Sequence, residues 1–559
     1  MVLRPSVVLA LGFLVAAWVA LAAAPIPERG DAMVSSSHAL ASEAGASVLR
    51  RGGNAADAAV ATALAAGVVQ PSSSGLGGGG FAIWVDRSER AALDFREVAP
   101  AAAYRDMFRT EDGVVDPTAS RVGGRAVAVP GEPRGLADLL AAHGSLPPSV
   151  VAAPAIELAS RGFPVGRHLH AALERTPHEG VGALLGIGDA LPRPGERVRR
   201  ATLAKTLKRW ASSRGGFFYE GPGAAALVEA VGEAGGAITA EDLERYASTP
   251  RKPVIVQYRG YTVIGMSPPS SGGVALGQML QVLERYDLKA LGHNSSDYVH
   301  LLTETMKHVF ADRARFLGDP DFVEVPVERL LSKERIGEVQ RAIWPGRTFG
   351  PDHYGEPIAP HRDAGTQHIS VVDAQGRAVA LTTTINTSFG SGLVVGPLGI
   401  VLNNEMDDFA SAPGVPNAYG LVGSEANAVA PGKRPLSSMT PTVVLDPEGE
   451  VVMALGASGG SFIISAVLQV FLDVVEFGLD PQEAVAAPRF HHQWVPDQLF
   501  LEPGFPADVQ RALEARGHTL TERDGFSSVQ VVLVEGDHLA GGADPRTGGW
   551  PAGVWGVVP

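Results

Sequence analysis

Residues 365–388 read GTQHISVVDAQGRAVALTTTINTS, and this stretch predicts a β-hairpin on which the rest of the interpretation depends. Two β-rich runs, 368–373 and 377–384, flank Ala-Gln-Gly, which suits a three-residue hairpin loop with glycine in the left-handed conformation. If the residues on either side of the loop pair, the same register places Thr366 opposite Thr384. Two hydroxyls that face each other across strands can share a hydrogen bond, which is an arrangement that a threonine nucleophile needs.

The composition describes a large globular protein without cysteine. The 559 residues suffice for two to four average domains or for one interwoven core. With 46 basic and 60 acidic residues the net charge is −14, which disfavours nucleic acid as a partner. Because there is no cysteine, covalent chemistry must use Ser, Thr, Lys or a carboxylate.

The first residues predict an export signal. Arg4 precedes an apolar run, Val7–Ala24, that ends in three alanines before Pro25. We expect cleavage near Ala24, so that residues 1–24 are a signal peptide and the mature protein is periplasmic or secreted. The alternative is an uncleaved anchor, because a run of about 18 apolar residues approaches the length that spans a bilayer.

The chain before residue 365 predicts a largely helical region with a few strands. Between residues 31 and 67 we expect two helices, separated by Gly52-Gly53, with Asn54 capping the second. Further helices are expected at 148–161, 202–213, 224–234, 273–286 and 296–317, and strands at 82–85, 92–95 and 254–266. Residues 342–365 are rich in Pro, Gly and polar residues, and we expect them to be exposed and mobile.

The chain after the hairpin predicts a strand at 398–402, a long loop at 413–435 of the kind that forms lids, and a second hairpin from 441–445 and 451–455. A helix is expected at 463–477. The glycine run before it, at 456–460, fits the Gly-x-Ser-x-Gly pattern of serine hydrolases, with Asp480 and His491 or His492 downstream. That pattern is loose in a glycine-rich chain and lies too near the C-terminus, so we do not favour Ser458 as a nucleophile.

Several other clusters have two interpretations each. The glycines of 75–80 lack the Lys-Ser/Thr that a phosphate-binding P-loop requires, so we expect them to mark a close backbone passage. His491-His492 has no third ligand at metal spacing and suits packing better. Arg96, the acidic run 404–408 and Ser437-Ser438 suit ordinary ion pairs and turns when each is taken alone. We expect neither a metal nor a cofactor.

Taken together and in order, these motifs resemble the gamma-glutamyltranspeptidase family across nearly the whole mature chain. The matching stretches are Gly52–Ala59, Leu76–Phe81, Asp94–Glu97, Pro268–Gly273, Ala311–Asp321, Thr366–Asp373, Leu402–Phe409, Lys433–Met439 and Pro488–Trp494.

The resemblance implies an N-terminal nucleophile hydrolase with a four-layer αββα sandwich, of the α/β (α+β) class. It implies a precursor that cuts itself between Gly365 and Thr366 into a large subunit, 25–365, and a small subunit, 366–559, that form one interwoven core. The freed α-amine of Thr366, with a pKa of about 8, would then act as the base for its own hydroxyl.

The resemblance also implies a role for each site residue. Thr366 would attack a γ-glutamyl amide such as glutathione, and the acyl-enzyme would pass to water or to an amino acid or dipeptide acceptor. The supporting residues would be Thr384 on the nucleophile, Gly459 and Gly460 at the oxyanion, Arg96, Ser437 and Ser438 on the α-carboxylate, Asn386, Glu405 and Asp408 on the α-ammonium, and Tyr419 in the lid over the substrate.

Two other functions remain open at this point. An acylase of the same fold, acting on glutaryl-cephalosporin side chains, would share the nucleophile, although the expected lid favours small γ-glutamyl substrates. A non-catalytic periplasmic protein that binds γ-glutamyl compounds would show no new N-terminus at Thr366.

Overall fold

The computed structural model describes residues 28–116, 118–175, 180–185, 191–355, 365–410, 424–525 and 527–556. The expected signal peptide, 1–24, lies outside these ranges, as does the expected lid, residues 413–423 of the long loop, which contains Tyr419.

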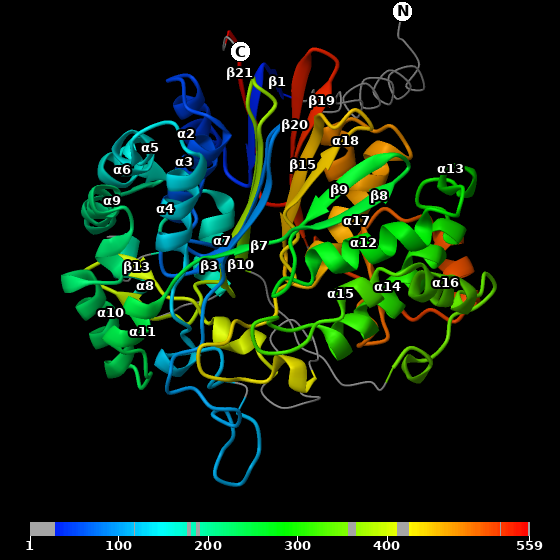
Figure 1. Cartoon of the computed structure of the whole chain (residues 1–559), viewed down its shortest axis with the longest axis horizontal. Helices are drawn as coiled ribbons and strands as arrows, with labels where there is room; N and C mark the ends of the chain where they lie inside the picture. The colour runs from blue at the N-terminus through cyan, green and yellow to red at the C-terminus, as the bar shows by residue number, and fades with distance from the viewer. Residues whose placement is uncertain are drawn as a thin grey trace, which may run out of the picture.

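Two seven-stranded sheets lie face to face at the centre of the molecule (Figure 1). The first follows the order β1 (Glu28–Gly30), β20 (His538–Ala543), β19 (Ser528–Glu535), β15 (Val451–Ser458), β14 (Thr442–Leu445), β9 (Tyr261–Gly265) and β8 (Val254–Tyr258). The second follows β21 (Ala552–Val554), β2 (Ala32–Ser36), β10 (Gly365–Val372), β11 (Ala378–Asn386), β3 (Gly79–Val85), β4 (Arg90–Phe95) and β7 (Thr249–Arg251). Each sheet therefore contains strands from both sides of Gly365.

Helices cover the outer faces of both sheets, which gives the expected order of helix, sheet, sheet and helix (Figure 1). Beside the second sheet lie α2 (Ala39–Leu49), α3 (Ala55–Val69), α4 (Glu132–His143), α5 (Pro148–Val151), α6 (Ala153–Arg161), α7 (Arg167–Arg175), α8 (Val181–Leu185), α9 (Ala201–Ser213), α10 (Gly221–Glu233) and α11 (Ala240–Arg245). Beside the first lie α12 (Gly272–Leu283), α13 (Leu288–Leu291), α14 (Ser296–Phe316), α15 (Val327–Leu330), α16 (Lys333–Ala342), α17 (Phe462–Val475), α18 (Pro481–Ala486) and α19 (Ala507–Ala515).

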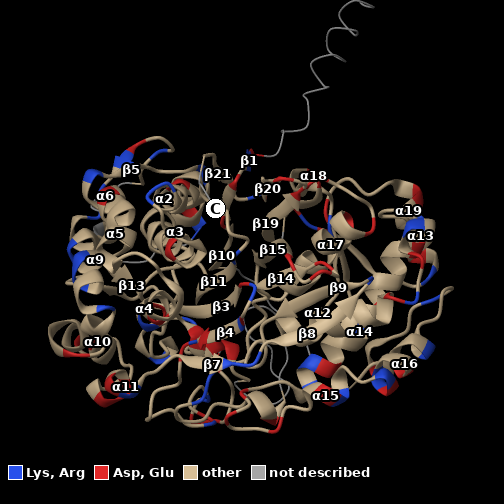
Figure 2. Cartoon of the chain, turned by 45° about the horizontal axis from the view of Figure 1, so that its top comes forward, with Lys and Arg blue, Asp and Glu red and all other residues tan. Residues whose placement is uncertain are grey.

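Charge follows this layering. Lys, Arg, Asp and Glu gather on peripheral helices such as α6, α9, α15 and α16, whereas the two central sheets carry few of them (Figure 2). Within the described ranges, no helix combines the length and the apolar character that crossing a bilayer requires.

The hairpin of β10 and β11 has the predicted register. Thr366 pairs with Thr384, and the Asp373 N–H donates to the Arg377 carbonyl over 3.0 Å. The register shifts by one residue between Gly365 and Thr366. Such a β-bulge re-aims the side chain beside it and is common near functional sites.

The predicted helix pair before the hairpin is confirmed, but the strand in front of it was missed. Asn54 caps α3 and exchanges hydrogen bonds with Asp57 in a capping box. The preceding residues 32–36 form β2, which pairs with β10 and so places the N-terminal part of the chain against the candidate nucleophile strand.

Two element boundaries were predicted wrongly. Residues 254–266 form the hairpin of β8 and β9 rather than one strand, because Arg259 and Gly260 turn the chain with φ of 52° and 88°. The expected helix 148–161 is divided into α5 and α6 at Ala152.

Residues 342–355 are largely exposed, as expected, with Trp344 55% exposed, but side-chain hydrogen bonds also tie this segment to α14. The Tyr354 hydroxyl donates to a Glu304 oxygen over 2.6 Å, and the Lys307 ammonium donates to the Thr348 hydroxyl over 2.7 Å. Both Glu304 and Lys307 are buried residues of α14. The rest of the expected segment, 356–364, lies outside the described residues.

Candidate active site

The two threonines predicted to face each other are in contact. Thr366 Oγ1 and Thr384 Oγ1 are 3.1 Å apart, and Thr384 Oγ1 donates to the carbonyl oxygen of Gly365 over 2.8 Å. Because a hydroxyl carries a single proton, Thr366 must be the donor in the bond between the two threonines. Thr384 therefore both orients the Thr366 hydroxyl and polarises the peptide carbonyl in front of it.

The backbone around this pair is held by close contacts. A Cβ on Gly365 would lie 2.4 Å from the Thr387 carbonyl oxygen, so no larger residue fits there. Asn386 ends β11 at a φ of 73°, which a non-glycine residue adopts only when its surroundings hold it. Its backbone N–H donates to Thr384 Oγ1 over 2.9 Å, and its side-chain amide donates to the Asn404 carbonyl over 3.0 Å.

The glycines of the expected close passage pack directly under this strand end. A Cβ on Gly77 would lie 2.0 Å from the Val401 carbonyl oxygen, and one on Gly78 would lie 1.9 Å from the Thr384 carbonyl oxygen. The passage therefore serves backbone packing beside Thr384, as the sequence predicted.

Gly459 and Gly460 form the turn between β15 and α17, with φ of 130° and 60°. Within the described part of the chain, neither of their N–H groups donates a hydrogen bond. Gly460 lines one cavity that Thr366 also lines, and Gly459 lines another, so both N–H groups lie near Thr366. Unused backbone donors at the start of a helix suit a developing oxyanion.

One of these cavities, here called the Arg96 cavity, gathers nearly all the predicted binding residues. It is lined by Arg96, Arg313, Thr366, Thr384, Asn386, Glu405, Asp408, Ser437, Ser438, Met439, Gly460 and Ile463. The residues come from α14, β10, β11, α17, the short 3-10 helix Glu405–Asp408 and the 436–440 segment, while Arg96 directly follows β4 and Gly460 lies in the turn before α17.

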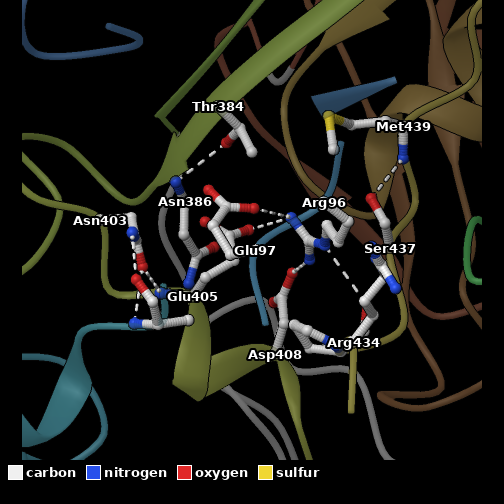
Figure 3. A network of polar contacts seen from close by, with 12 residues as sticks. Arg96, Glu97, Thr384, Asn386, Asn403, Glu405, Asp408, Arg434, Ser437 and Met439 are labelled. Atoms are coloured by element: carbon white, nitrogen blue, oxygen red, sulfur yellow. Dashed lines mark hydrogen bonds and ion pairs between the residues drawn. The ribbon is translucent and has the colours of Figure 1, made fainter. Parts of the chain in front are cut away.

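Arg96 is the centre of the polar network in this cavity (Figure 3). It is 1% exposed, and its guanidinium bonds Glu405 and Asp408 while its Nε donates to the Pro435 carbonyl over 3.3 Å. The two groups expected to hold opposite ends of a ligand thus pair with each other in this structure. The interpretation of Arg96 as a surface ion pair is excluded by its burial.

The electrostatics of the network are set by burial. Burial raises the pKa of Glu405 well above its usual value in spite of the neighbouring Arg96. Burial likewise raises the pKa of Glu97, whose carboxylate lies 3.7 Å from Arg96. Because both carboxyls favour the protonated form, the network holds fewer negative charges than its three carboxyl groups would suggest.

Arg313 is the site residue to which the sequence interpretation assigned no role. Its Nη2 donates to the Ser438 hydroxyl over 3.1 Å, and its Nε donates to the Ser271 hydroxyl over 3.0 Å. Burial lowers its pKa to about 10, which still leaves it charged at neutral pH. The signal that could have found it is the motif Ala311–Asp321, which places charged residues on a buried helix.

The two serines differ in their surroundings. Ser437 Oγ accepts from the Met439 N–H over 3.1 Å, and the Ser437 carbonyl accepts from the Ser271 N–H over 2.8 Å. Ser438 Oγ accepts from Arg313, so its own proton can point into the cavity.

The disfavoured serine-hydrolase pattern does not assemble. Asp480 caps α18, and His491 bonds Ser465 and Gln493 rather than Ser458. His492 accepts from the Trp494 N–H and lies 3.3 Å from Asp497, which confirms a packing and hydrogen-bonding role for the histidine pair.

Among the residues that the structure describes, His300, Glu304 and His518 form a further group of metal-ligand types, on α14 and beside it rather than at Thr366. His300 and His518 share a hydrogen bond of 2.7 Å, and Glu304 accepts from Thr348 and Tyr354. These groups are engaged with one another and with residues 344–354, so we assign them to anchoring that segment.

A threonine at the start of a central strand, between two helix-covered sheets, is the arrangement of N-terminal nucleophile hydrolases. Cephalosporin acylase from Bacillus halodurans superposes with a TM-score of 0.82 at 30% identity, over 95% of this chain and 98% of its own. The gamma-glutamyltranspeptidase of Helicobacter pylori gives a TM-score of 0.57 at 38% identity, over 60% of this chain and 97% of the solved chain.

Sequence comparisons agree on one family. The glutathione hydrolase proenzyme of Escherichia coli (strain K12) is 42% identical over 92% of this chain and 90% of its own length. The glutathione hydrolase proenzyme of Bacillus subtilis (strain 168) is 38% identical over 94% of this chain and 92% of its own. Residues 41–554 match the family model described as Gamma-glutamyltranspeptidase. This chain therefore belongs to the gamma-glutamyltranspeptidase family.

Proposed function

We propose that this protein is a γ-glutamyltransferase and glutathione hydrolase whose nucleophile, Thr366, is freed by self-cleavage of the Gly365–Thr366 bond. The observation that carries the proposal is the chain of contacts from the Thr366 hydroxyl through Thr384 Oγ1 to the Gly365 carbonyl. These contacts bring the hydroxyls of Thr366 and Thr384 and the carbonyl oxygen of Gly365 within hydrogen-bonding distance of one another along the uncut chain.

In the self-cleavage step, the Thr366 hydroxyl attacks the Gly365 carbonyl carbon while Thr384 stabilises the charge that develops on oxygen. The peptide C–N bond breaks and leaves an ester on Thr366, which water hydrolyses. The products are the large subunit, 25–365 after loss of the signal peptide 1–24, and the small subunit, 366–559.

In the transfer reaction, the free α-amine of Thr366 takes the proton from its own hydroxyl, which attacks the γ-carbonyl of the donor. The N–H groups of Gly459 and Gly460 receive the oxyanion. The resulting acyl-enzyme is resolved by water, which completes hydrolysis, or by the amine of an amino acid or dipeptide.

The Arg96 cavity suits the α-amino acid end of the donor. We assign the α-carboxylate to Arg96, Ser437 and Ser438, and the α-ammonium to Asn386, Glu405 and Asp408. Arg96 bonds both Glu405 and Asp408 in this structure. A zwitterion brings one charge of each sign, so it exchanges partners with this network without leaving a charge unpaired. Tyr419 would lie over the bound donor.

The same balance separates the proposed function from the acylase alternative. A glutaryl group has no α-ammonium, so it would leave the Glu405 side of the network without a partner. Because the fold superposes closely on that of a cephalosporin acylase, turnover of the two kinds of substrate is what distinguishes the two functions. We expect turnover of a γ-glutamyl substrate to exceed that of glutaryl-cephalosporin by about 100-fold or more.

The decisive experiment is intact mass and N-terminal sequencing, followed by release of p-nitroaniline from γ-glutamyl-p-nitroanilide with and without glycylglycine. Wild-type protein should begin a second chain at Thr366 and turn over the anilide faster with glycylglycine. Thr366→Ala should stay uncut and inactive, whereas Thr366→Ser should still be cut. A wild-type chain that turns over the anilide while uncut would refute the proposal, and binding without turnover would leave only a binding protein. Recovery of the mature protein from the periplasm or medium tests its export.

A further inference from the structure

A second and larger cavity reaches Thr366 from the other side. This cavity, here called the Arg523 cavity, encloses about 1200 Å³ with its open mouth, against about 300 Å³ for the Arg96 cavity. Thr366 lines both, while Gly460 lines the Arg96 cavity and Gly459 lines the Arg523 cavity. The proposed oxyanion donors therefore stand at the junction of the two spaces.

This junction dictates how an amide must lie across Thr366. The carbonyl of the substrate amide occupies the junction. The acyl group of the substrate then extends into one of the two cavities, and its amine side extends into the other. The Arg96 cavity holds the matched charges that suit the α-amino acid end of the acyl group. The amine side must then enter the Arg523 cavity, which has room for a dipeptide.

The Arg523 cavity has a cationic lining. Arg175, Arg523 and Arg546 line it together with His168, and no Asp or Glu is among the described residues of its wall. Burial and the neighbouring Arg175 lower the pKa of His168, so its imidazole adds no charge at neutral pH. In a protein with a net charge of −14, a wall of this sign is a local departure from the rest of the molecule.

The three arginines do not contribute equally. Arg546 bonds Glu502 and Asp544 behind the wall, which neutralises it. Arg175, the last residue of α7, has no acidic partner within the described part of the chain. The Arg523 guanidinium lies 4.8 Å from the centre of the Phe462 ring, and Phe462 begins α17 just after the Gly459-Gly460 turn. Arg523 is thus fixed next to the oxyanion donors.

We propose that Arg175 and Arg523 make the Arg523 cavity select leaving groups and acceptors that carry a carboxylate, such as peptides with a free C-terminus. This inference rests on the proposed function. In the transfer half-reaction, the neutral amine nitrogen of the acceptor attacks the ester carbonyl carbon. The new C–N bond forms, the C–O bond to Thr366 breaks, and the amine proton returns to Thr366 Oγ by way of the free α-amine.

The test compares pairs of molecules that differ only in this carboxylate. With γ-glutamyl-p-nitroanilide as donor, glycylglycine is compared with glycylglycinamide at equal concentrations of free amine. With water as acceptor, release of glycine from γ-glutamylglycine is compared with release of glycinamide from its amide. We expect wild-type kcat/KM to favour the carboxylate form by about tenfold in both arms, and this preference to fall as salt is raised.

The variant Arg175→Gln/Arg523→Gln should lower the preference to less than about threefold in both arms. Arg523→Lys keeps the positive charge and should therefore keep most of the preference for the carboxylate form. Arg87→Gln is the matched control, because the Arg87 side chain is 81% exposed on a turn far from Thr366 in the sequence, and it should match the wild type.

The outcomes separate the two proposals. If wild-type protein is uncut or releases no p-nitroaniline, the proposed function fails. If wild-type protein is cut and releases p-nitroaniline but shows no carboxylate preference, only the assignment of the Arg523 cavity fails. The same assignment fails if the double variant keeps the wild-type ratio. If the double variant does not fold, Arg175→Gln alone can be tested, because Arg175 lies on the exposed end of α7. Together with the wild-type comparison, it still decides whether the Arg523 cavity selects carboxylates. A preference in the acceptor arm alone would overturn the shared use of the cavity by the leaving group.

Discussion

At the scale of single residues, the hydroxyl of Thr384 is the feature with the clearest consequence. It donates to the Gly365 carbonyl, so removing it takes away the group that polarises the bond to be cut. We expect Thr384→Ala to slow self-cleavage about tenfold or more, which corresponds to the ~1.4 kcal/mol of one hydrogen bond to a developing charge. Thr384→Ser should keep most of the rate. The fraction of cut chain on denaturing gels over time gives the measurement.

The neighbouring residue supplies the control for this prediction. Thr383 Oγ1 is buried on the same strand and has no hydrogen-bond partner within the described part of the chain. Thr383→Val keeps the volume and removes only an unsatisfied hydroxyl, so self-cleavage should proceed at the wild-type rate. Equal slowing in both variants would mean that general damage to β11, rather than the Thr384 hydroxyl, limits the cut.

The sequence predicted the pairing of Thr366 with Thr384 because a three-residue loop determines the register of a short hairpin. It could not predict that Arg96 bonds Glu405 directly, since these residues are 309 positions apart and only the folded chain brings them together. Arg313 was missed for a related reason. A charged residue in a helix usually faces solvent, and its burial depends on the 268–273 and 436–440 segments that pack over α14.

At the scale of elements, the glycine passage before β3 supports the end of β11. Because a Cβ on Gly78 would overlap the Thr384 carbonyl oxygen, Gly78→Ala must displace one strand from the other. We expect a loss of about 2 kcal/mol or more in the free energy of unfolding, together with slower self-cleavage. Urea unfolding in a Thr366→Ala background, which keeps the chain in one piece, measures the first effect, and gels in the wild-type background measure the second.

The same substitution elsewhere should act in the opposite direction. Gly232 lies in α10, and a Cβ there would meet nothing within 4 Å. Gly232→Ala should stabilise the protein by up to about 1 kcal/mol, because alanine is the better helix former. A stabilising Gly78→Ala would contradict the close passage.

Helix α4 begins with a buried acid that predicts how stability depends on pH. Glu132 is fully buried, and burial raises its pKa to about 8 although a backbone contact with Gly75 opposes the shift. The unfolded chain releases this proton near pH 4.5, whereas the folded chain keeps it, so folding is penalised as pH rises through this interval.

Glu132→Gln removes the titration and should therefore gain stability relative to the wild type as pH rises from 5 to 8, by roughly 3 kcal/mol. The free energy of unfolding of the two proteins, both in the uncut Thr366→Ala background, is compared at pH 5, 6.5 and 8. A constant difference between Glu132→Gln and the wild type across this range would mean that the Glu132 carboxyl ionises normally in the folded protein.

The element boundaries show where sequence patterns stop being informative. Alternation of apolar residues continues through Arg259 and Gly260, so residues 254–266 read as one strand although the backbone reverses there. The strand β2 was missed because its five residues directly precede a long alanine-rich helical pattern. Their extended conformation is stabilised by pairing with β10, which is distant in the sequence. Short strands at such junctions depend on partners that are distant in the sequence.

At the scale of the whole molecule, the proposed cut site lies inside a fold that neither half can complete. The first sheet joins β1, β8 and β9 from before Gly365 to four strands from after it, and the second joins four strands from before it to β10, β11 and β21. Both hydrophobic cores likewise contain residues from the two halves. Separating the halves would expose both cores and the edges of paired strands, which has a large cost in free energy. Loss of the single peptide bond between the halves should therefore not separate them.

We therefore expect the two chains of the matured protein to remain one particle. On size-exclusion chromatography with light scattering, the cut wild type and uncut Thr366→Ala should elute together with the same mass, although a denaturing gel shows two bands for the first and one for the second. The chains should part only at the urea concentration where tertiary structure is lost, because no smaller opening frees β10 and β11 from their neighbours β2 and β3. Elution of 366–559 as a separate species in buffer would contradict the interleaved strand order.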